Sequence, residues 1–186
     1  MLSAERGVNG AGSSVVARPL ARAATARDVK RLLAHRDVAR YGWTIEYDDD
    51  VLVTVALQAR TNQYPPDRAD SYTLTLNCES YDAWPPETKF VNPQTRTYII
   101  GQDEKYLPII SGFPNFGLHV RFNGFYDKAR VDQLICFSLT RGYYDSAHVP
   151  EPDQRWTPGH HWLYSTIKVL HRALSPAFYG GRIPAV

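Results

Sequence analysis

The sequence contains no long apolar run. No window approaches the roughly 18 to 20 uninterrupted apolar residues that a membrane-spanning helix requires, and the N-terminal stretch lacks a continuous apolar segment ahead of a cleavage site. We therefore expect a cytoplasmic protein with no membrane association.

A strong excess of charge is also missing. The formal net charge is +2 over 186 residues, so the field that would attract nucleic acid is weak and we expect no nucleic-acid partner. A chain of this length can bury most of its apolar side chains in one domain. We predict a flexible tail over residues 1–24, where glycine, serine, alanine and arginine follow no sustained period, and a single domain over residues 25–186.

Cysteine is scarce in this chain. Its two cysteines are Cys78 and Cys136, and without an export signal we interpret them as thiols with separate roles rather than as a disulfide. Zinc-ligand spacings such as C-x-x-C and H-x-x-x-H are missing, so we expect neither a metal nor a cofactor. A metal-dependent hydrolase built on the histidines is poorly supported for the same reason.

Two periodic patterns predict helices. Thr25 and Asp28 form a Thr-x-x-Asp capping pattern, and apolar residues at helical spacing then continue to about Val38. A second amphipathic pattern predicts a helix over residues 163–174.

Between these helices, alternating apolar residues predict an antiparallel meander. The expected strands are Trp43–Tyr47, Val51–Ala59, Tyr72–Cys78 and a short strand around Phe90. The Pro85-Pro86 pair forces an extended, turning path before the fourth strand. Residues 92–133 follow no regular pattern and are predicted as a long irregular segment. The expected fold class is α+β.

The two cysteines fall in different settings. Cys78 shares the apolar face of its predicted strand, which indicates a small buried side chain. Cys136 lies in the apolar run Leu134–Leu139, LICFSL, and polar residues follow closely from Arg141, which is not typical of the middle of a buried strand. Cys136 is therefore either a buried small residue or a partly exposed nucleophile.

Taken in order, these elements resemble the ubiquitin-conjugating enzyme (E2) fold between about residues 25 and 176. The matching residues are Tyr72, Leu74, Leu76, Tyr81, Pro85, Pro86 and Phe90 in the strand-to-corner segment, Ile135-Cys136-Phe137-Ser138-Leu139 around the family's active-site cysteine, and Trp156-Thr157-Pro158 before the last helix. Each string is common by itself, and their shared order makes the resemblance specific. The chain looks like the divergent bacterial E2 proteins of ubiquitin-like conjugation and antiphage defence operons.

The chain departs from the family's pattern in three places. The gap between Pro86 and Cys136 is longer than in typical E2s, which predicts an insertion around residues 96–132, and a second insertion separates Cys136 from Trp156. The family's C-terminal helices look reduced or absent. The resemblance thus implies a UBC-like fold with an N-terminal helix, a four-stranded antiparallel meander, an active-site loop and one following helix.

The resemblance also implies an activity. An E2 accepts a ubiquitin-like protein from an E1-like activating enzyme as a thioester, here on Cys136, and transfers it to an amine of a target protein. The alternative is a catalytically inactive E2-like or RWD-like adaptor that binds the E1-like or ubiquitin-like partner. The basic face of Arg27, Lys30 and Arg31 on the first helix is expected to meet the activating enzyme.

A further expectation concerns the oxyanion that forms during transfer. E2s carry an H-P-N motif whose asparagine amide acts as a donor and braces the loop. The nearest string here is Phe113-Pro114-Asn115, which lacks the histidine and lies far from Cys136 in the sequence. Asn115 is therefore a candidate for this role, and His119 and Asn123 are its rivals.

The segment between the cysteine and the last helix adds three histidines. His160 or His161 is a candidate proton acceptor for the incoming amine, and His148 is a less favoured one. We interpret Trp156 and Pro158 as structural residues that brace the loop after the cysteine against the last helix. The Gly180-Gly181 pair is predicted as a turn.

Overall fold

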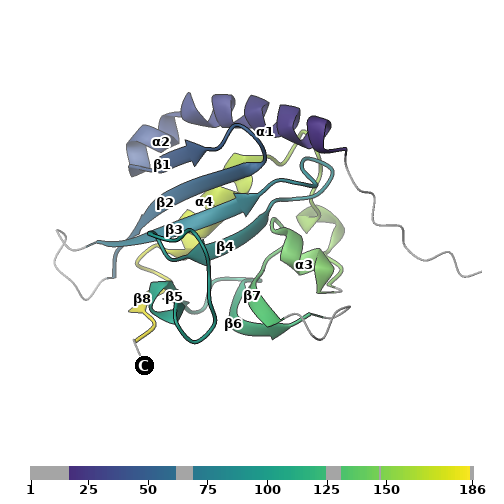
Figure 1. The fold of residues 1–186 in the computed structure, drawn as a ribbon. Helices are drawn as coiled ribbons and strands as arrows, with labels where there is room; N and C mark the ends of the chain where they lie inside the picture. The colour runs from purple at the N-terminus through teal and green to yellow at the C-terminus, as the bar shows by residue number, and fades with distance from the viewer. Residues whose placement is uncertain (1–16, 62–68, 125–130, 147, 185–186) are drawn as a thin grey trace, which may run out of the picture.

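The computed structural model describes residues 17–61, 69–124, 131–146 and 148–184. The fold is α+β: a four-stranded antiparallel sheet occupies the centre, helix α1 lies along one side of it, and helix α4 lies behind it (Figure 1). The strands of this sheet are β1 (Thr44–Tyr47), β2 (Leu52–Ala59), β3 (Asp70–Asn77) and β4 (Glu87–Val91).

The strands pair in chain order, β1-β2-β3-β4, so the predicted meander is confirmed. Alternate residues of β2 are buried, because a β-branched or long apolar side chain at every second position faces the core. The turn between β1 and β2 is closed by the Asp48 carboxylate, which accepts hydrogen bonds from the backbone N–H groups of Asp50 and Leu52.

Helix α1 (Arg18–Leu33) begins before the predicted start at Thr25. Pro19 occupies the first turn, where its missing N–H costs nothing, and the Thr25 hydroxyl donates to the carbonyl of Ala21 within the helix instead of capping it. Residues 18–24 are therefore helical, which corrects the predicted tail for this part. Ala17 is the N-cap residue of this helix, and residues 1–16 lie outside the described residues.

The predicted first helix is also divided at its C-terminal end. Helix α1 stops at Leu33, and a separate helix α2 (Arg36–Tyr41) follows, in which the His35 ring nitrogen accepts a hydrogen bond from the N–H of Asp37. Gly42 ends α2 with a φ of 63°, a left-handed conformation that glycine adopts without steric cost.

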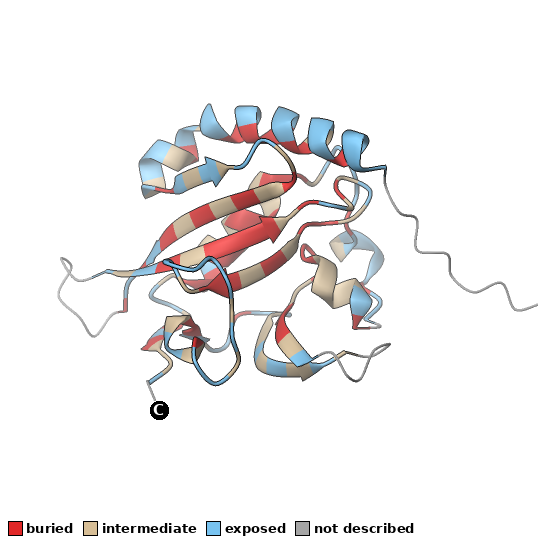
Figure 2. Ribbon diagram, in the orientation of Figure 1, coloured by how far each residue is buried: buried red, intermediate tan, exposed pale blue. Residues whose placement is uncertain are grey.

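Helix α4 (Leu163–Ala173) confirms the predicted last helix. It packs on α1 and on β2, and its buried residues Leu163, Ile167 and Leu170 join the core (Figure 2). None of the helices that the model describes is long and apolar enough to cross a membrane.

The segment predicted as irregular, residues 92–133, contains two strands and the start of a third. The strands are β5 (Pro108–Ile110), β6 (Gly117–Asn123) and β7 (Val131–Cys136), and β6 and β7 form an antiparallel hairpin. The alternation along β6 is weak because its side chains are only half-buried or exposed, so its sequence carries little apolar periodicity.

The predicted turn at Gly180-Gly181 is wrong. Both glycines belong to β8 (Tyr179–Arg182), which pairs with β5. A Cβ on Gly180 would contact the Ile109 side chain at 3.4 Å, so the absence of a side chain lets the two strands approach closely.

Short helices connect the remaining elements. They are η1 (Glu104–Tyr106), α3 (Arg141–Asp145) and η2 (Pro152–Gln154). Helix α3 follows directly on the strand that carries Cys136, and it contacts both β7 and β4.

Candidate functional site

Cys136 is the last residue of β7, and its side chain is half-buried. Leu134, Ile135 and Leu139 of the run LICFSL are buried, and the half-buried Cys136 and Phe137 lie between them. The hydroxyl of the buried Thr140 stabilises the turn that follows Cys136, since it lies 2.7 Å from the carbonyl oxygen of Ile135 and 2.8 Å from that of Phe137.

A surface groove of about 500 Å³ opens at Cys136. It is lined by Asn115, Phe116, Gly117, Cys136, Tyr143, Val149, Glu151 and Gln154. These residues come from the loop before β6, from the end of β7, from α3 and from the segment after it. The thiol is therefore open to a ligand that enters along this groove.

His148 contacts the thiol. Its Nδ1 lies 4.0 Å from Cys136 Sγ and 2.9 Å from Ser146 Oγ, and its ring stacks on Tyr143 with centroids 4.8 Å apart. Partial burial raises the pKa of the Cys136 thiol. A neighbouring group that favours the thiolate would therefore increase the reactivity of Cys136.

Cys78 behaves differently, as predicted from its strand face. It is fully buried in the main core, and burial raises the pKa of its thiol to about 12. This thiol is not available as a nucleophile, because only the thiolate attacks.

The structure brings two of the predicted oxyanion candidates close to Cys136. Asn115 lines the same groove, and its φ of 54° is a left-handed conformation that asparagine tolerates better than most residues. His119 lies on the hairpin beside Gly117, where a Cβ would be 3.3 Å from His119 Nε2 and 3.5 Å from Cys136 Cβ.

The other rival, Asn123, is not near the thiol. It pairs with Val131, whereas Cys136 pairs with Gly117 at the opposite end of the hairpin. Five residues of strand separate the two positions by about 16 Å. Asn123 therefore cannot act on Cys136 in this arrangement.

The histidine pair before α4 also lies apart from the groove. His160 is exposed and contacts the His161 ring, which in turn packs on Trp156. Neither histidine is among the residues that line the groove at Cys136. The less favoured candidate, His148, is the one that the structure brings to the thiol, and only the fold after α3 reveals this proximity.

Three motifs of the sequence meet beside the site. The backbone N–H of Arg141 donates to the carbonyl of Pro86, and the Trp156 indole N–H donates to the carbonyl of Asp82 at 2.8 Å. The Arg141 guanidinium also stacks over the Trp84 ring at 4.5 Å. Trp156 is thus joined to the segment before the Pro-Pro corner. The predicted bracing of the loop after Cys136 against the last helix stays a prediction.

The expected basic face of α1 is only partly free. Arg27 pairs with Asp28 and Asp82, and the Arg31 guanidinium lies 3.9 Å above the Trp162 ring. Lys30 is exposed.

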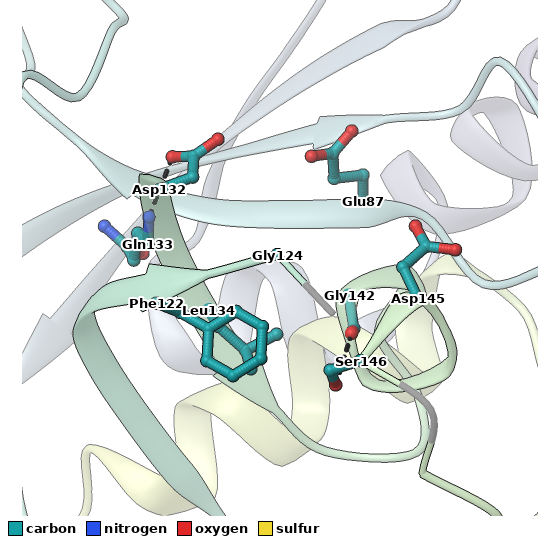
Figure 3. A pocket seen from close by; sticks show the side chains of 9 residues that line it. All are labelled: Glu87, Phe122, Gly124, Asp132, Gln133, Leu134, Gly142, Asp145 and Ser146. Atoms are coloured by element: carbon teal, nitrogen blue, oxygen red, sulfur yellow. Dashed lines mark hydrogen bonds between the residues drawn. The ribbon is translucent and has the colours of Figure 1, made fainter. Parts of the chain in front are cut away.

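A second, smaller hollow of about 70 Å³ lies between β4, the hairpin and α3. Figure 3 shows the carboxylates of Glu87, Asp132 and Asp145 around it, with the Phe122 ring at its side. Cys136 is not among its lining residues. Within the described ranges, no group of three or more His, Cys, Asp or Glu side chains is arranged to hold a metal ion.

Comparison with known proteins adds no identification. No protein-family model matches the chain, and no curated protein sequence matches it.

Proposed function

We propose that this protein is an E2-like conjugating enzyme that carries a ubiquitin-like protein as a thioester on Cys136 and transfers it to an amine of a target protein. The observation that carries the proposal is the position of Cys136, a half-buried thiol at the end of β7 that opens into a groove shared with Asn115. A nucleophile of this kind must be reachable and still be held by a rigid element.

The arrangement around the site supports a UBC-like fold. The N-terminal helix, the four-stranded meander, the cysteine-bearing strand and the helix after Trp-x-Pro follow in the order that the resemblance implies. The Pro-Pro corner, α3 and Trp156 are also joined by hydrogen bonds.

The chemistry requires one nucleophile and one donor. The Cys136 thiolate attacks the thioester carbonyl on the activating enzyme, a new S–C bond forms, and the activating enzyme's cysteine leaves as a thiolate. The intermediate carries an oxyanion, and the Asn115 amide at the edge of the groove is suited to donate a hydrogen bond to it. The target amine then attacks the thioester carbonyl on Cys136, so that a C–N bond forms and the C–S bond breaks. Cys136 leaves as a thiolate, and the amine loses its proton to solvent.

A docking surface for an acidic activating enzyme follows from the same proposal. Lys30 is exposed, and Arg27 and Arg31 also present exposed side chains although they have partners within the chain. Charge reversal at Lys30 should slow thioester loading. Unchanged loading would remove this surface from the proposal.

The adaptor remains a second candidate because of two observations. Burial raises the pKa of the Cys136 thiol, which disfavours the nucleophilic form at neutral pH. In addition, the residue in place of the family's H-P-N histidine is Phe113, which is buried and packs on Phe178 with centroids 4.8 Å apart. An adaptor would need the fold and its docking faces but no thiolate.

A loading assay separates the two candidates. The protein is incubated with ATP, an E1-like enzyme and a ubiquitin-like protein that this enzyme activates, and is analysed on gels with and without reductant. A conjugating enzyme gives an adduct that reductant removes, that Cys136→Ala abolishes and that Cys78→Ala retains. Intact binding of either partner with no adduct would support the adaptor.

A further inference from the structure

A hydrogen bond between Trp43 and His171 joins the end of α4 to the start of the main sheet. The Trp43 indole N–H donates to His171 Nδ1 at 3.2 Å. Trp43 is buried and immediately precedes β1, and His171 lies in the last turn of α4. The two rings meet edge to face with centroids 5.5 Å apart, and the His171 ring also packs on Tyr41 of α2 at 4.4 Å. The pair therefore connects α4 with both α2 and the start of β1.

The direction of this hydrogen bond determines the protonation state of His171. An indole N–H can only donate, so Nδ1 of His171 must offer its lone pair and carries no hydrogen. The ring is then neutral, with its single hydrogen on Nε2. An imidazolium donates from both nitrogens, so a proton on Nδ1 removes the acceptor of the buried Trp43 N–H.

From this geometry we propose that Trp43 and His171 form an acid-sensitive latch, which holds the end of α4 to the start of β1 while His171 is neutral and opens when His171 takes up a proton. The proton comes from solvent and binds Nδ1, and the Trp43 hydrogen bond is lost. Neither residue is among those that line the groove at Cys136, so the latch does not depend on the function proposed above.

The surroundings of His171 favour its neutral form. Burial, followed by the positive charge of Lys168 one turn earlier on α4, lowers the pKa of His171, and the Asp37 carboxylate of α2 opposes these two effects. Because the folded-state pKa is lowered, the contribution of the latch to stability is fully present above about pH 6.5. It is lost as the pH falls through the lowered value.

The charged neighbours keep their charges while His171 titrates. Hydrogen bonds from Lys168 and then Tyr164 lower the pKa of Asp37 to about 2, so its carboxylate stays ionised. Burial opposes the charge of Lys168, but its hydrogen bonds to Asp37 and Tyr41 prevail and raise its pKa. Among the described residues, two arginines, a further histidine and two tyrosines also lie around the pair: Arg40, Arg172, His35, Tyr41 and Tyr164.

The test follows both ends of the hydrogen bond by NMR in the full-length protein, from about pH 8 to 5, the range in which histidine titrates. Long-range proton–nitrogen spectra report which imidazole nitrogens carry a hydrogen. The variant His171→Gln identifies the His171 signals, including their separation from those of His35, and Trp43→Phe identifies the Trp43 indole signal. The glutamine side-chain oxygen accepts a hydrogen bond as Nδ1 does, but it does not titrate.

We expect His171 to carry its hydrogen on Nε2 at about pH 8 and to titrate below its ordinary value. The Trp43 indole signal should move with the same midpoint, and exchange of its hydrogen with water should become faster as the bond opens. In His171→Gln both changes should disappear. The wild-type melting temperature should also fall more steeply between about pH 8 and 5 than that of His171→Gln.

Three results would overturn the proposal. The first is a hydrogen on Nδ1 of His171 at about pH 8, because Trp43 could then not donate to it. The second is a Trp43 indole signal that does not follow the titration of His171, or that moves equally in His171→Gln. The third is a melting temperature with the same pH dependence in the wild type and in His171→Gln, since the bond would then not hold the two elements. Should Trp43→Phe fail to fold, the four indole signals are assigned through Trp84→Phe, Trp156→Phe and Trp162→Phe instead.

Discussion

The side-chain amide of Gln133 hydrogen-bonds both backbone groups of Phe90. Its Oε1 accepts from the Phe90 N–H at 2.7 Å, and its Nε2 donates to the Phe90 carbonyl at 3.0 Å. Because the β6–β7 hairpin forms a sheet separate from the main one, this side chain takes the place of strand pairing between β7 and the edge strand β4. Gln133 thereby holds β7 against β4 three residues before Cys136.

Replacement of Gln133 by leucine should destabilise the protein. Gln133 is buried, so Gln133→Leu leaves a donor and an acceptor of Phe90 without partners in a site closed to water. Each unsatisfied group costs about 1 to 3 kcal/mol, so we expect a loss of roughly 2 to 6 kcal/mol in the free energy of unfolding. Urea unfolding measures it.

The control for Gln133→Leu lies on the same strand. Val131 is 47% exposed, so Val131→Thr should change the free energy of unfolding by less than about 0.5 kcal/mol. Equal stability of Gln133→Leu and the wild type would show that the amide does not hold β7 on β4.

Gly142 in α3 allows close contact with β7. A Cβ at this position would lie 2.7 Å from Leu134 Cδ1, so Gly142→Ala forces the buried Leu134 side chain to shift. Replacing glycine by alanine in a helix stabilises the protein by about 1 kcal/mol through helix propensity, whereas overpacking a buried site destabilises it by about 1 to 3 kcal/mol. We expect a net loss of stability of about 1 kcal/mol by urea unfolding, with the larger effect on the reactivity of Cys136, since α3 carries Tyr143.

A double-mutant cycle isolates this contact. In a Leu134→Ala background the obstructing methyl group is gone, so adding Gly142→Ala should be neutral or stabilising. If Gly142→Ala costs the same in both backgrounds, Leu134 is not the cause of the loss.

Local patterns predicted the meander and α4 because their period is visible within one element. In β2, for example, Val53, Val55 and Leu57 alternate with half-buried residues, and such a pattern needs no knowledge of distant contacts. The predicted start of α1 was wrong because the prediction relied on the capping pattern at Thr25. Residues 18–24, which precede Thr25, are rich in alanine, and Pro19 is their only strong signal for a helix start.

The parts that depend on distant contacts could not be predicted. Strand β8 pairs with β5, which lies about 70 residues earlier in the sequence. Two of its four residues are glycines, so β8 shows no alternation of apolar and polar side chains. At the site, Cys136 was a candidate from its sequence setting, but the choice of His148 over His160 required the path of the chain after α3. The sequence also could not show that Asn123 lies far from Cys136, because that distance is set by the length of the β6–β7 hairpin.

The two cysteines should react in different states of the protein. Native protein treated with iodoacetamide at about pH 8 should gain one label, on Cys136, because Cys78 is fully buried and burial raises the pKa of its thiol to about 12. Protein unfolded in urea should gain two. Peptide mass spectrometry identifies each site, and rapid labelling of Cys78 in the native protein would contradict its place in the core.

Asp37 joins α2 to α4 and should make stability depend on acid pH. Its carboxylate accepts hydrogen bonds from Lys168 Nζ and from Tyr164 Oη, both at 2.8 Å, and these groups, Lys168 first, lower the pKa of Asp37 to about 2. In an unfolded chain the value is about 3.9. A lowered folded-state pKa means that the contribution is fully present above about pH 4 and is lost as the pH falls toward 2.

Asp37→Asn should therefore lower the urea midpoint at neutral pH, and its difference from the wild type should narrow steadily between about pH 4 and 2. Asp153→Asn, at an exposed residue of η2, is the matched control and should leave the midpoint nearly unchanged at every pH. A difference between Asp37→Asn and the wild type that stays constant down to about pH 2 would mean that packing around the side chain, and not the charge of the carboxylate, joins the two helices.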